Sequence, residues 1–409
     1  MMRALSAVAL GLVAGLFGTA WGQEPPGKTA EKGKADPPAA TTPAVTAPGT
    51  VPPATTPPAV AAPPAGPAAA EYLKTFEDWK TILKDLRKLK IQYQSADAAN
   101  QKPLEDQWAA LVTKGNATLA TLQAAGLKAF AEAPNEDPQL TRFLVKLASD
   151  AADRDEYEAV MQICDLLIKN NCDDKTIYGP ASLASYALHD FDKAAEYLKL
   201  ATEAGVAPAA FSSSNIDLKQ YKTWWDEEQK IRADEAAKND LPRVKLTTTK
   251  GEIVIELFEN QAPETVGNFI SLVEKQPKPY FDDTPFHRVL KNFMAQGGDP
   301  TGTGTGGPGY MIYDECKKPN FRRHFRGSVS MAKSPGPNTG GSQFFLTFLP
   351  TAHLNGEHTC FGRIVEGMDV LAKLQRINPD AEAKPTPDKI IKAEVVRKRD
   401  HAYAPRKVE

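Results

Sequence analysis

The segment from Phe286 to Asp299 holds the side chains best suited to chemistry. It combines the guanidinium of Arg288 and the primary amide of Gln296 with the apolar side chains of Phe293 and Met294. A guanidinium is permanently charged, so this set is poor for proton transfer and good for donating hydrogen bonds to a peptide carbonyl. Residues two apart share one face of an extended strand. We therefore expect a turn or a bulge to intervene before Gln296 can join Arg288.

Three blocks of sequence follow one another in a fixed order in the second half of the chain. They are Phe286-His287-Arg288-Val289 with Phe293-Met294-Ala295-Gln296-Gly297-Gly298-Asp299, then Ser330-Met331-Ala332 with Pro337-Asn338-Thr339-Gly340-Gly341-Ser342-Gln343-Phe344-Phe345, and finally Leu354-Asn355-Gly356-Glu357-His358 with Phe361-Gly362. Together they resemble the signature of the cyclophilins, the peptidyl-prolyl cis/trans isomerases. The resemblance covers residues 242–400 and implies an isomerase that acts on proline-containing polypeptides and requires no cofactor and no metal.

The resemblance also implies roles for individual residues. It gives catalytic positions to Arg288, Gln296, Phe293 and His358, and substrate-binding positions to Met294, Ala332, Lys333, Gln343, Phe345, His353 and Leu354. Donation by Arg288 to the imide nitrogen would localise the nitrogen lone pair and make the C–N bond more like a single bond. From the residues alone, the apolar members could equally be barrel core, and Arg288 a surface side chain lying over a hydrophobic patch.

Two departures from the family pattern fall at this pocket. His353 stands where many members carry tryptophan, and the smaller polar ring should weaken binding of cyclosporin-type inhibitors more than catalysis. An extra residue in Lys333-Ser334-Pro335-Gly336 lengthens the neighbouring loop. His353 and His358 are five positions apart, which does not place two imidazoles on one helical face for a metal.

A glycine-rich run between residues 302 and 307 formally matches the pattern G-x-G-x-x-G. A dinucleotide site needs a strand before these glycines and a helix after them. The following Pro308-Gly309 forbids that helix. We therefore predict a loop at the rim of the peptide groove.

Composition limits the partners and leaves the cysteine chemistry open. The 409 residues allow two or three domains, and 49 basic against 51 acidic residues give a formal net charge of -2. Such a balance offers no global field for nucleic acid. The four cysteines, whose spacing is not that of a zinc site, could form disulfides or remain buried free thiols. They are Cys164, Cys172, Cys316 and Cys360.

The N-terminus is typical of an export signal. Residues 1–22 contain Arg3, an apolar run over residues 4–17 and the small-x-small site Ala20-Trp21-Gly22. An uncleaved anchor is the alternative, although the run is short for a bilayer, and no later segment is long and apolar enough to span one. We expect a periplasmic or extracellular protein. Residues 23–70, rich in Pro, Ala and Thr, should form a disordered linker, with a proline-rich ligand or internal substrate as the alternative.

Residues 71–240 are predicted to form an all-α domain. Apolar residues recur there at three- and four-residue steps, at Tyr72, Phe76, Trp79, Ile82, Leu83, Leu86 and Leu89. Further helices are expected at residues 104–114, 117–133, 138–151 and 218–238. Residues 156–161 align with residues 190–195 at an offset of 34, the tetratricopeptide period. An ordinary helical bundle is the alternative, and the domain could bind a partner protein or act as a spacer.

From residue 241 to 400 the periodicity becomes that of β-strands. Val244 to Thr248 and Ile253 to Leu257 alternate around Lys250-Gly251, which predicts two strands joined by a tight turn. A helix should start near Ala262-Pro263. The family resemblance implies a mainly-β, closed eight-stranded barrel capped by two helices. The basic tail, residues 401–409, is interpreted as a solvated end.

Three functions are compatible with these features. The first is an X-Pro isomerase that assists the folding of exported proteins. The second is a binding module that grips proline peptides without turnover, recruited through the helical domain. The third is a holdase chaperone that acts mainly through the helices.

Overall fold

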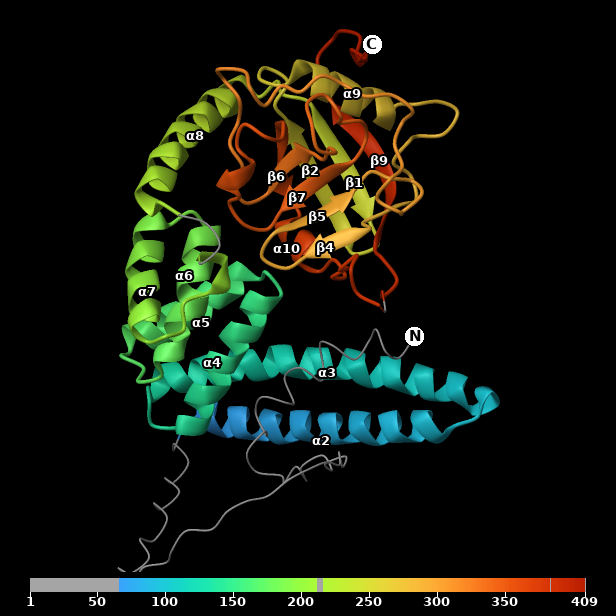
Figure 1. Ribbon diagram of the computed structural model, residues 1–409. Coiled ribbons are helices and arrows are strands. Elements are labelled where there is room, and N and C mark those ends of the chain that lie inside the picture. The colour runs from blue at the N-terminus through green and yellow to red at the C-terminus, as the bar shows by residue number, and fades with distance from the viewer. Residues whose placement is uncertain (1–65, 212–215, 383, 409) are drawn as a thin grey trace, which may run out of the picture.

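The computed structural model describes residues 66–211, 216–382 and 384–408. The predicted signal peptide and nearly all of the predicted linker lie outside these ranges. In Figure 1 a helical part, blue to green, precedes a curled sheet, yellow to red, and α8 (Leu218–Lys238) joins them. This is the predicted order of a helical region and a mainly-β region. Within the described ranges no helix has the length and hydrophobicity needed to cross a bilayer.

The helical part begins with a long antiparallel hairpin of α2 (Pro67–Ser95) and α3 (Ala98–Glu132). The predicted apolar stripe of α2 is its buried face, and the helix starts four residues before the predicted boundary because Pro67 is tolerated in a first turn. The prediction of two helices over residues 104–133 was wrong. No proline stands at Gly115-Asn116 to break the helix. Packing against α2 outweighs the helix-propensity cost of about 1 kcal/mol for glycine.

Shorter helices follow the hairpin and lead to the barrel. They are α4 (Pro138–Asp153), α5 (Tyr157–Lys169), α6 (Tyr178–Ala187) and α7 (Phe191–Glu203), with 3-10 turns η1 (Lys175–Ile177) and η2 (Ala209–Phe211) before α8. The break before Pro138 and the bounds of α8 agree with the prediction. Helices α5 and α7 both have 13 residues and begin 34 positions apart.

The second part is an antiparallel sheet of nine strands. The strands are β1 (Arg243–Thr248), β2 (Gly251–Leu257), β3 (Thr284–Pro285), β4 (Arg288–Leu290), β5 (Met294–Gly297), β6 (Ser328–Met331), β7 (Phe344–Thr347), β8 (Cys360–Glu366) and β9 (Lys389–Arg397). Their order is β3-β9-β1-β2-β8-β6-β7-β5-β4. The predicted pair of strands around Lys250-Gly251 is β1 and β2.

The prediction of eight strands in a closed barrel is corrected by the two ends of this sheet. β3 pairs with β9 and β4 pairs with β5, while no ladder joins β3 to β4 among the described residues. Phe286 and His287 lie between β3 and β4 and belong to neither strand. Phe286 is fully buried and packs in the core. The curled sheet is therefore open in its hydrogen bonding, and its ends are linked only by these two residues.

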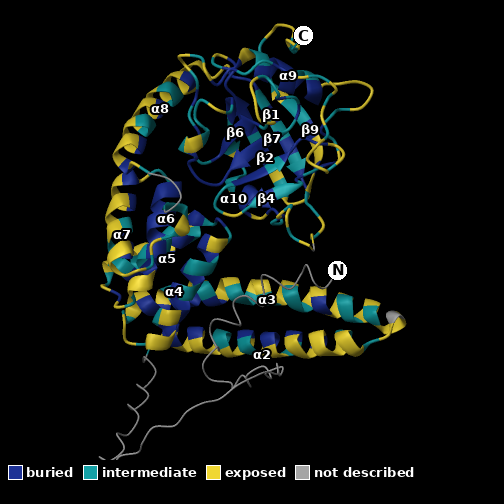
Figure 2. Ribbon diagram, viewed as in Figure 1, coloured by how far each residue is buried: buried dark blue, intermediate teal, exposed yellow. Residues whose placement is uncertain are grey.

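Two helices accompany the sheet, as the resemblance implied. α9 (Pro263–Val273) starts with proline in its first turn and buries Val266, Phe269 and Ile270, and α10 (Met368–Ala372) is a single short turn. They lie at opposite ends of the sheet in Figure 1. Figure 2 shows the strands to be mainly buried, whereas the far end of the α2–α3 hairpin is mainly exposed.

Buried ion pairs fasten α8 to the sheet. Arg322 donates to Glu228 at 2.6 and 3.0 Å and to Glu235 at 2.5 Å. Arg363 of β8 donates to Glu235 at 3.0 Å and to Glu256 of β2 at 2.6 Å. The side chains of Arg322, Glu228 and Glu235 are 1%, 5% and 6% exposed. Because a buried charge without a partner is strongly unfavourable, this network fixes how the helical part sits on the barrel.

Most of the C-terminal tail is exposed, as expected, but some of its residues contact the barrel. His401 and Tyr403 donate to the two carboxylate oxygens of Glu259 at 2.6 and 3.0 Å. Lys407 forms an antiparallel bridge with Ile312. The ring of Tyr403 also packs against the barrel core, which supplies the apolar contact that a purely basic tail would lack.

All four cysteines are free and buried. Burial raises the pKa of the Cys360 thiol to about 11. The structure therefore agrees with the free-thiol alternative.

Candidate active site

Arg288 is positioned by a hairpin made of β4 and β5. The strands are joined by a turn at residues 291–293, in which Asn292 adopts φ 57°. Asparagine tolerates this left-handed conformation better than most residues. The register places Arg288 opposite Gln296. The expected break between the two residues is thus a turn, and it brings the guanidinium and the amide onto neighbouring strands.

The helical part holds this turn from behind. Asp155, between α4 and α5, accepts a hydrogen bond from the backbone N–H of Asn292 at 2.7 Å. The hydroxyl of Tyr157 lies 2.7 Å from Asp155 and 3.1 Å from the side-chain oxygen of Asn292. Arg376 of the barrel region donates to the same carboxylate at 2.5 Å. Burial raises the pKa of Asp155 although Arg376 opposes the shift. Sequence analysis missed Asp155, because it lies 137 positions from Asn292.

The guanidinium of Arg288 lies against the pocket without a fixed partner. Its central carbon is 5.7 Å from the centre of the Phe293 ring. Partial burial lowers its pKa, and Asp380 opposes the shift. Within residues 66–211, 216–382 and 384–408, no side chain or carbonyl accepts a hydrogen bond from this guanidinium. Its donors are therefore available to a ligand.

The polar side of the site is a chain of amides. The Gln296 amide donates to the side-chain oxygen of Gln343 at 2.9 Å. The Gln343 amide in turn donates to the carbonyls of Gly304 and Gly306, both at 2.9 Å. The glycine-rich run is therefore tied to the site as a rim, as predicted.

Asp299 organises the rim from inside. This fully buried carboxylate accepts hydrogen bonds from the backbone N–H groups of Thr301, Gly304 and Gly306 at 2.8, 2.7 and 3.0 Å. Burial alone would raise its pKa, but these donors and the Thr301 hydroxyl lower the pKa of Asp299 to about 2. A Cβ at Gly306 would lie 2.0 Å from the carboxylate, so only glycine allows this close approach.

The apolar side is built by β5, β7 and the segment before β8. Met294 and Phe345 are buried, and Leu354 is half-buried. His358 stands edge-on to the Phe345 ring with 5.6 Å between ring centres. Its Nδ1 donates to the carbonyl of Met331 at 2.9 Å, which fixes the imidazole at the edge of the pocket.

His324 supports this wall from behind and was missed by sequence analysis. Its ring stacks on Phe345 with 6.1 Å between centres and 12° between planes. Its two ring nitrogens pair with Asn355 and Ser330 at 3.0 and 2.8 Å. Burial lowers the pKa of His324 to about 4, so the ring is neutral. No pattern in the sequence distinguishes this histidine from a surface residue.

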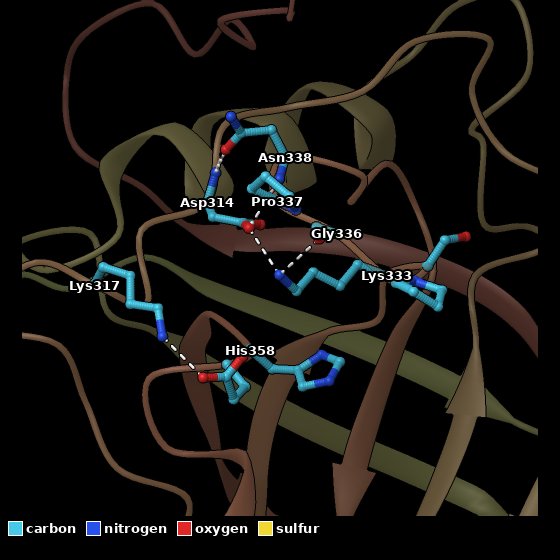
Figure 3. Close-up of a pocket in the computed structure, with 10 residues that line it drawn as sticks. Asp314, Lys317, Lys333, Gly336, Pro337, Asn338 and His358 are labelled. Carbon is cyan, nitrogen blue, oxygen red and sulfur yellow. Dashed lines mark hydrogen bonds and ion pairs between the residues drawn. The ribbon is translucent and has the colours of Figure 1, made fainter.

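The lengthened loop beside the pocket is closed by ion pairing. The backbone N–H of Ala332 donates to the carbonyl of Gln343 at 2.9 Å. The Lys333 side chain donates to Asp314 at 2.8 Å and to the carbonyl of Gly336 at 3.1 Å, as Figure 3 shows. A cavity of about 680 Å³ lies here and reaches His358. The Lys333 ammonium is thus occupied, which leaves its backbone as the group that could contact a peptide.

His353 lies on the opposite side of the pocket. It is exposed on η3 (Ala352–Leu354), and its ring centre is 5.7 Å from that of Phe293. Burial and the neighbouring His358 lower the pKa of His353. Among the described residues, no group of three histidine, cysteine or acidic side chains is arranged to hold a metal. The structure thus brings Arg288, Gln296 and Phe345 onto neighbouring strands, whereas His358 and His353 line two different cavities beside them.

The matches with known proteins lie in the barrel region of the chain. Residues 243–395 match the family described as cyclophilin type peptidyl-prolyl cis-trans isomerase/CLD. A Neurospora crassa protein named peptidyl-prolyl cis-trans isomerase-like 1 is 46% identical over 161 residues, covering 38% of this chain and 96% of the relative. A Helicobacter pylori peptidyl-prolyl cis-trans isomerase is 47% identical over 148 residues, covering 36% of this chain and 86% of the relative.

A solved structure gives a further match. It is that of a Cryptosporidium parvum cyclophilin type peptidyl-prolyl cis-trans isomerase in the presence of the dipeptide Ala-Pro. It is 37% identical and covers 37% of this chain and 98% of the other, with a TM-score of 0.34. The family match leaves the helical part, residues 66–242, outside it.

Proposed function

Because this chain belongs to the cyclophilin-type peptidyl-prolyl cis-trans isomerase family, we propose that Arg288 is the group that lowers the barrier to rotation about X-Pro bonds. The observation that carries this proposal is the unpartnered guanidinium beside the apolar pocket of Phe293, Met294 and Phe345. A proline ring in the pocket would bring its imide nitrogen within reach of the guanidinium. Donation to that nitrogen removes its lone pair from conjugation with the carbonyl.

The energy required is within the range of this mechanism. The uncatalysed barrier of about 18–20 kcal/mol makes the rotation take tens to hundreds of seconds. A thousandfold acceleration needs a reduction of roughly 4 kcal/mol. A charged donor whose hydrogen bond strengthens as the amide twists stabilises the transition state more than the ground state. No proton is transferred, so His358 has no need to titrate.

The remaining residues would bind and orient the peptide. Gln296 and Gln343 present an amide chain for the substrate backbone, and the backbone at Ala332 and Lys333 lies beside it. Leu354 and His358 would complete the wall of the proline pocket. Proline-containing polypeptides are the substrate class that fits this arrangement.

Arg288→Ala tests the proposal. We expect kcat/KM for a short Xaa-Pro peptide, measured in a protease-coupled assay, to fall at least about a hundredfold, because the donor proposed for the imide nitrogen is lost. Arg142→Ala on the exposed face of α4 is the matched control and should keep the wild-type rate. Equal rates for wild type and Arg288→Ala would contradict the proposed role of Arg288 and favour a proline-binding module or a holdase.

We also propose that the helical part is tetratricopeptide-like and recruits a partner protein. The equal lengths and 34-residue offset of α5 and α7 support this proposal. Stacked repeats commonly offer a concave surface to a peptide. Cross-linking with full-length protein should capture a partner at α5 to α7. Cross-links confined to the barrel would contradict the proposal and favour a spacer.

Finally, we propose that the protein is exported and assists the folding of exported proteins. The apolar run and small-x-small site within residues 1–22 support this proposal. Expression of the full chain in a bacterial host should yield a mature protein that begins directly after Gly22, as read by N-terminal sequencing. A chain that retains residue 1 in the cytoplasmic fraction would contradict it.

A further inference from the structure

We propose that the helical part completes an accessory subsite of the isomerase, which takes a bulky apolar side chain of the substrate next to its proline. The proposal rests on the isomerase function proposed above. Its starting point is a cavity of about 480 Å³ where the helices meet the barrel. The described lining includes Phe293 and His353 from the barrel and Tyr186, Ala210 and Tyr221 from the helical part.

The cavity borders the predicted proline site. Phe293 belongs to both, since its ring faces Arg288 at 5.7 Å and also lines the cavity. His353 lines the cavity beside it, with 5.7 Å between the two ring centres. A peptide held at Arg288 would therefore pass the mouth of the cavity within a few residues of its proline.

The helical wall of the cavity is mainly aromatic and aliphatic. The Tyr186 hydroxyl donates to the carbonyl of Pro350 at 2.8 Å, and the Tyr221 hydroxyl accepts from the backbone N–H of Ala352 at 3.1 Å. Both hydroxyls are thus engaged with the segment that carries His353. The two rings pack at 5.3 Å and 66°. What this wall offers to a ligand is aromatic surface.

One polar group of the lining is unsatisfied. Thr351 lines the cavity and is only 3% exposed, and its hydroxyl has no hydrogen-bond partner among the described residues. Buried polar groups normally have a partner. The hydroxyl oxygen itself has almost no exposed surface. Rotation of the Thr351 side chain would bring it to a carbonyl of a bound peptide backbone.

These features define the chemistry of the occupant. The volume lies within the range of about 300–1,000 Å³ that is usual for ligand pockets. The aromatic and aliphatic surface favours a leucine or aromatic side chain, because burial of apolar surface is the main gain available. The described lining contains no acidic, lysine or arginine side chain to pair with a charged residue. The occupant is thus a bulky apolar residue of the same polypeptide as the proline.

Peptide scanning combined with cavity filling tests the proposal. A host peptide with alanine around one proline is compared with peptides that carry leucine or phenylalanine at each of the three positions on either side. Isomerisation is followed by exchange NMR, which needs no protease, and binding by calorimetry. The full-length variants are Ala210→Trp and the milder Ala210→Leu, which fill the cavity. Ala209→Trp, on the exposed neighbouring residue, is the matched control.

Wild-type protein and Ala209→Trp should prefer a bulky apolar residue at one position by about tenfold in kcat/KM and in affinity. Ala210→Trp should abolish that preference and leave the rate on the alanine host unchanged, and Ala210→Leu should reduce it. Absence of a preference in wild type, or its survival in Ala210→Trp, would overturn the subsite. Failure of the proposed function has a different signature, which is no catalysis of the alanine host by wild type although binding still depends on the apolar residue.

Discussion

Single residues behind the pocket carry much of its geometry. Arg288, Gln296 and Phe345 face the site, but Asp299 holds the rim that Gln343 contacts, and His324 holds the Phe345 ring. These supporting residues make short contacts inside the protein. Their substitution should therefore affect stability and activity together.

Asp299→Asn tests the rim. The pKa of Asp299 in the folded protein is about 2, below the ordinary 3.8, so the carboxylate stabilises the fold above pH 4 and loses this contribution as the pH falls toward 2. A shift of that size is worth roughly 2 kcal/mol at pH 7. We expect Asp299→Asn to lower the free energy of urea unfolding by about that amount at pH 7, with the difference from wild type vanishing near pH 2. We also expect kcat/KM to fall several-fold, because the rim holds Gln343.

Asp283→Asn provides the comparison for this substitution. Asp283 is exposed, with a loose contact to Lys278 at 4.0 Å, and exposed pairs contribute little. The free energy of unfolding of Asp283→Asn should equal that of wild type at every pH. A pH-independent loss in Asp299→Asn would show that packing, rather than charge, explains the effect.

The sequence predicted the residues that face the pocket better than those behind them. The first block supplies Arg288 and Gln296 and the second supplies Phe345, and β4, β5 and β7, which carry them, are neighbours in the sheet. Asp155 contacts Asn292 from 137 positions away, and His324 shows no periodicity of its own. Such support depends on the packing of distant segments, which local patterns do not encode.

At the scale of elements, the attachment of α8 to the sheet rests on the buried arginine and glutamate network. Arg322→Ala would leave Glu228 and Glu235 short of a partner. Removing one member of a buried pair costs about 3–5 kcal/mol, and we expect that loss in the free energy of unfolding by denaturant. The neighbouring Arg323→Ala breaks the 2.7 Å pair with Glu227, whose side chain is half exposed, and a cation–π contact with Trp224 at 5.2 Å. Arg323→Ala should lower the free energy of unfolding by about 1 kcal/mol or less. Equal losses in Arg322→Ala and Arg323→Ala would contradict the importance assigned to burial of the network.

Acid should weaken the same attachment. Burial raises the pKa of Glu228, but Arg322 and Arg232 overcome this and leave its pKa below the usual value. A depressed pKa means stability that is present above the unfolded-state pKa and lost as the pH falls through the folded-state pKa. The difference between wild type and Arg322→Ala should therefore narrow in acid.

Element prediction succeeded where one periodic face was buried and failed where a boundary depended on tertiary contact. α8 begins and ends where its pattern predicted. α3 runs through Gly115 because α2 packs along it, and β3 and β4 are separated at Phe286 and His287, where the buried Phe286 ring packs in the core. The tail at Tyr403 packs for the same reason, since its partner Glu259 lies more than 140 positions earlier.

At the scale of the molecule, the helical part contacts the β4–β5 hairpin directly. Asp155 connects the turn at Asn292 to Arg376. We expect Asp155→Asn to reduce kcat/KM about tenfold, because small displacements of a positioned group are expensive for catalysis, while circular dichroism still shows a folded protein at the assay temperature.

The matched control removes a contact to the same β4–β5 turn. Asp153→Asn removes an exposed 2.7 Å pair with Lys291, and it should leave kcat/KM unchanged because both partners are more than half exposed. Equal effects of the two substitutions would mean that the helical part influences the hairpin only through general charge.

The break between β3 and β4 at Phe286-His287 has a consequence for how activity is acquired. Arg288 is the first residue after this break, and the chain on its two sides pairs with β9 and β5, which are almost 100 positions apart. The guanidinium reaches its place only when both pairings exist. During synthesis or refolding, isomerase activity should therefore appear late, together with the pairing of the C-terminal strand. A truncated or partly folded barrel should be inactive rather than partly active.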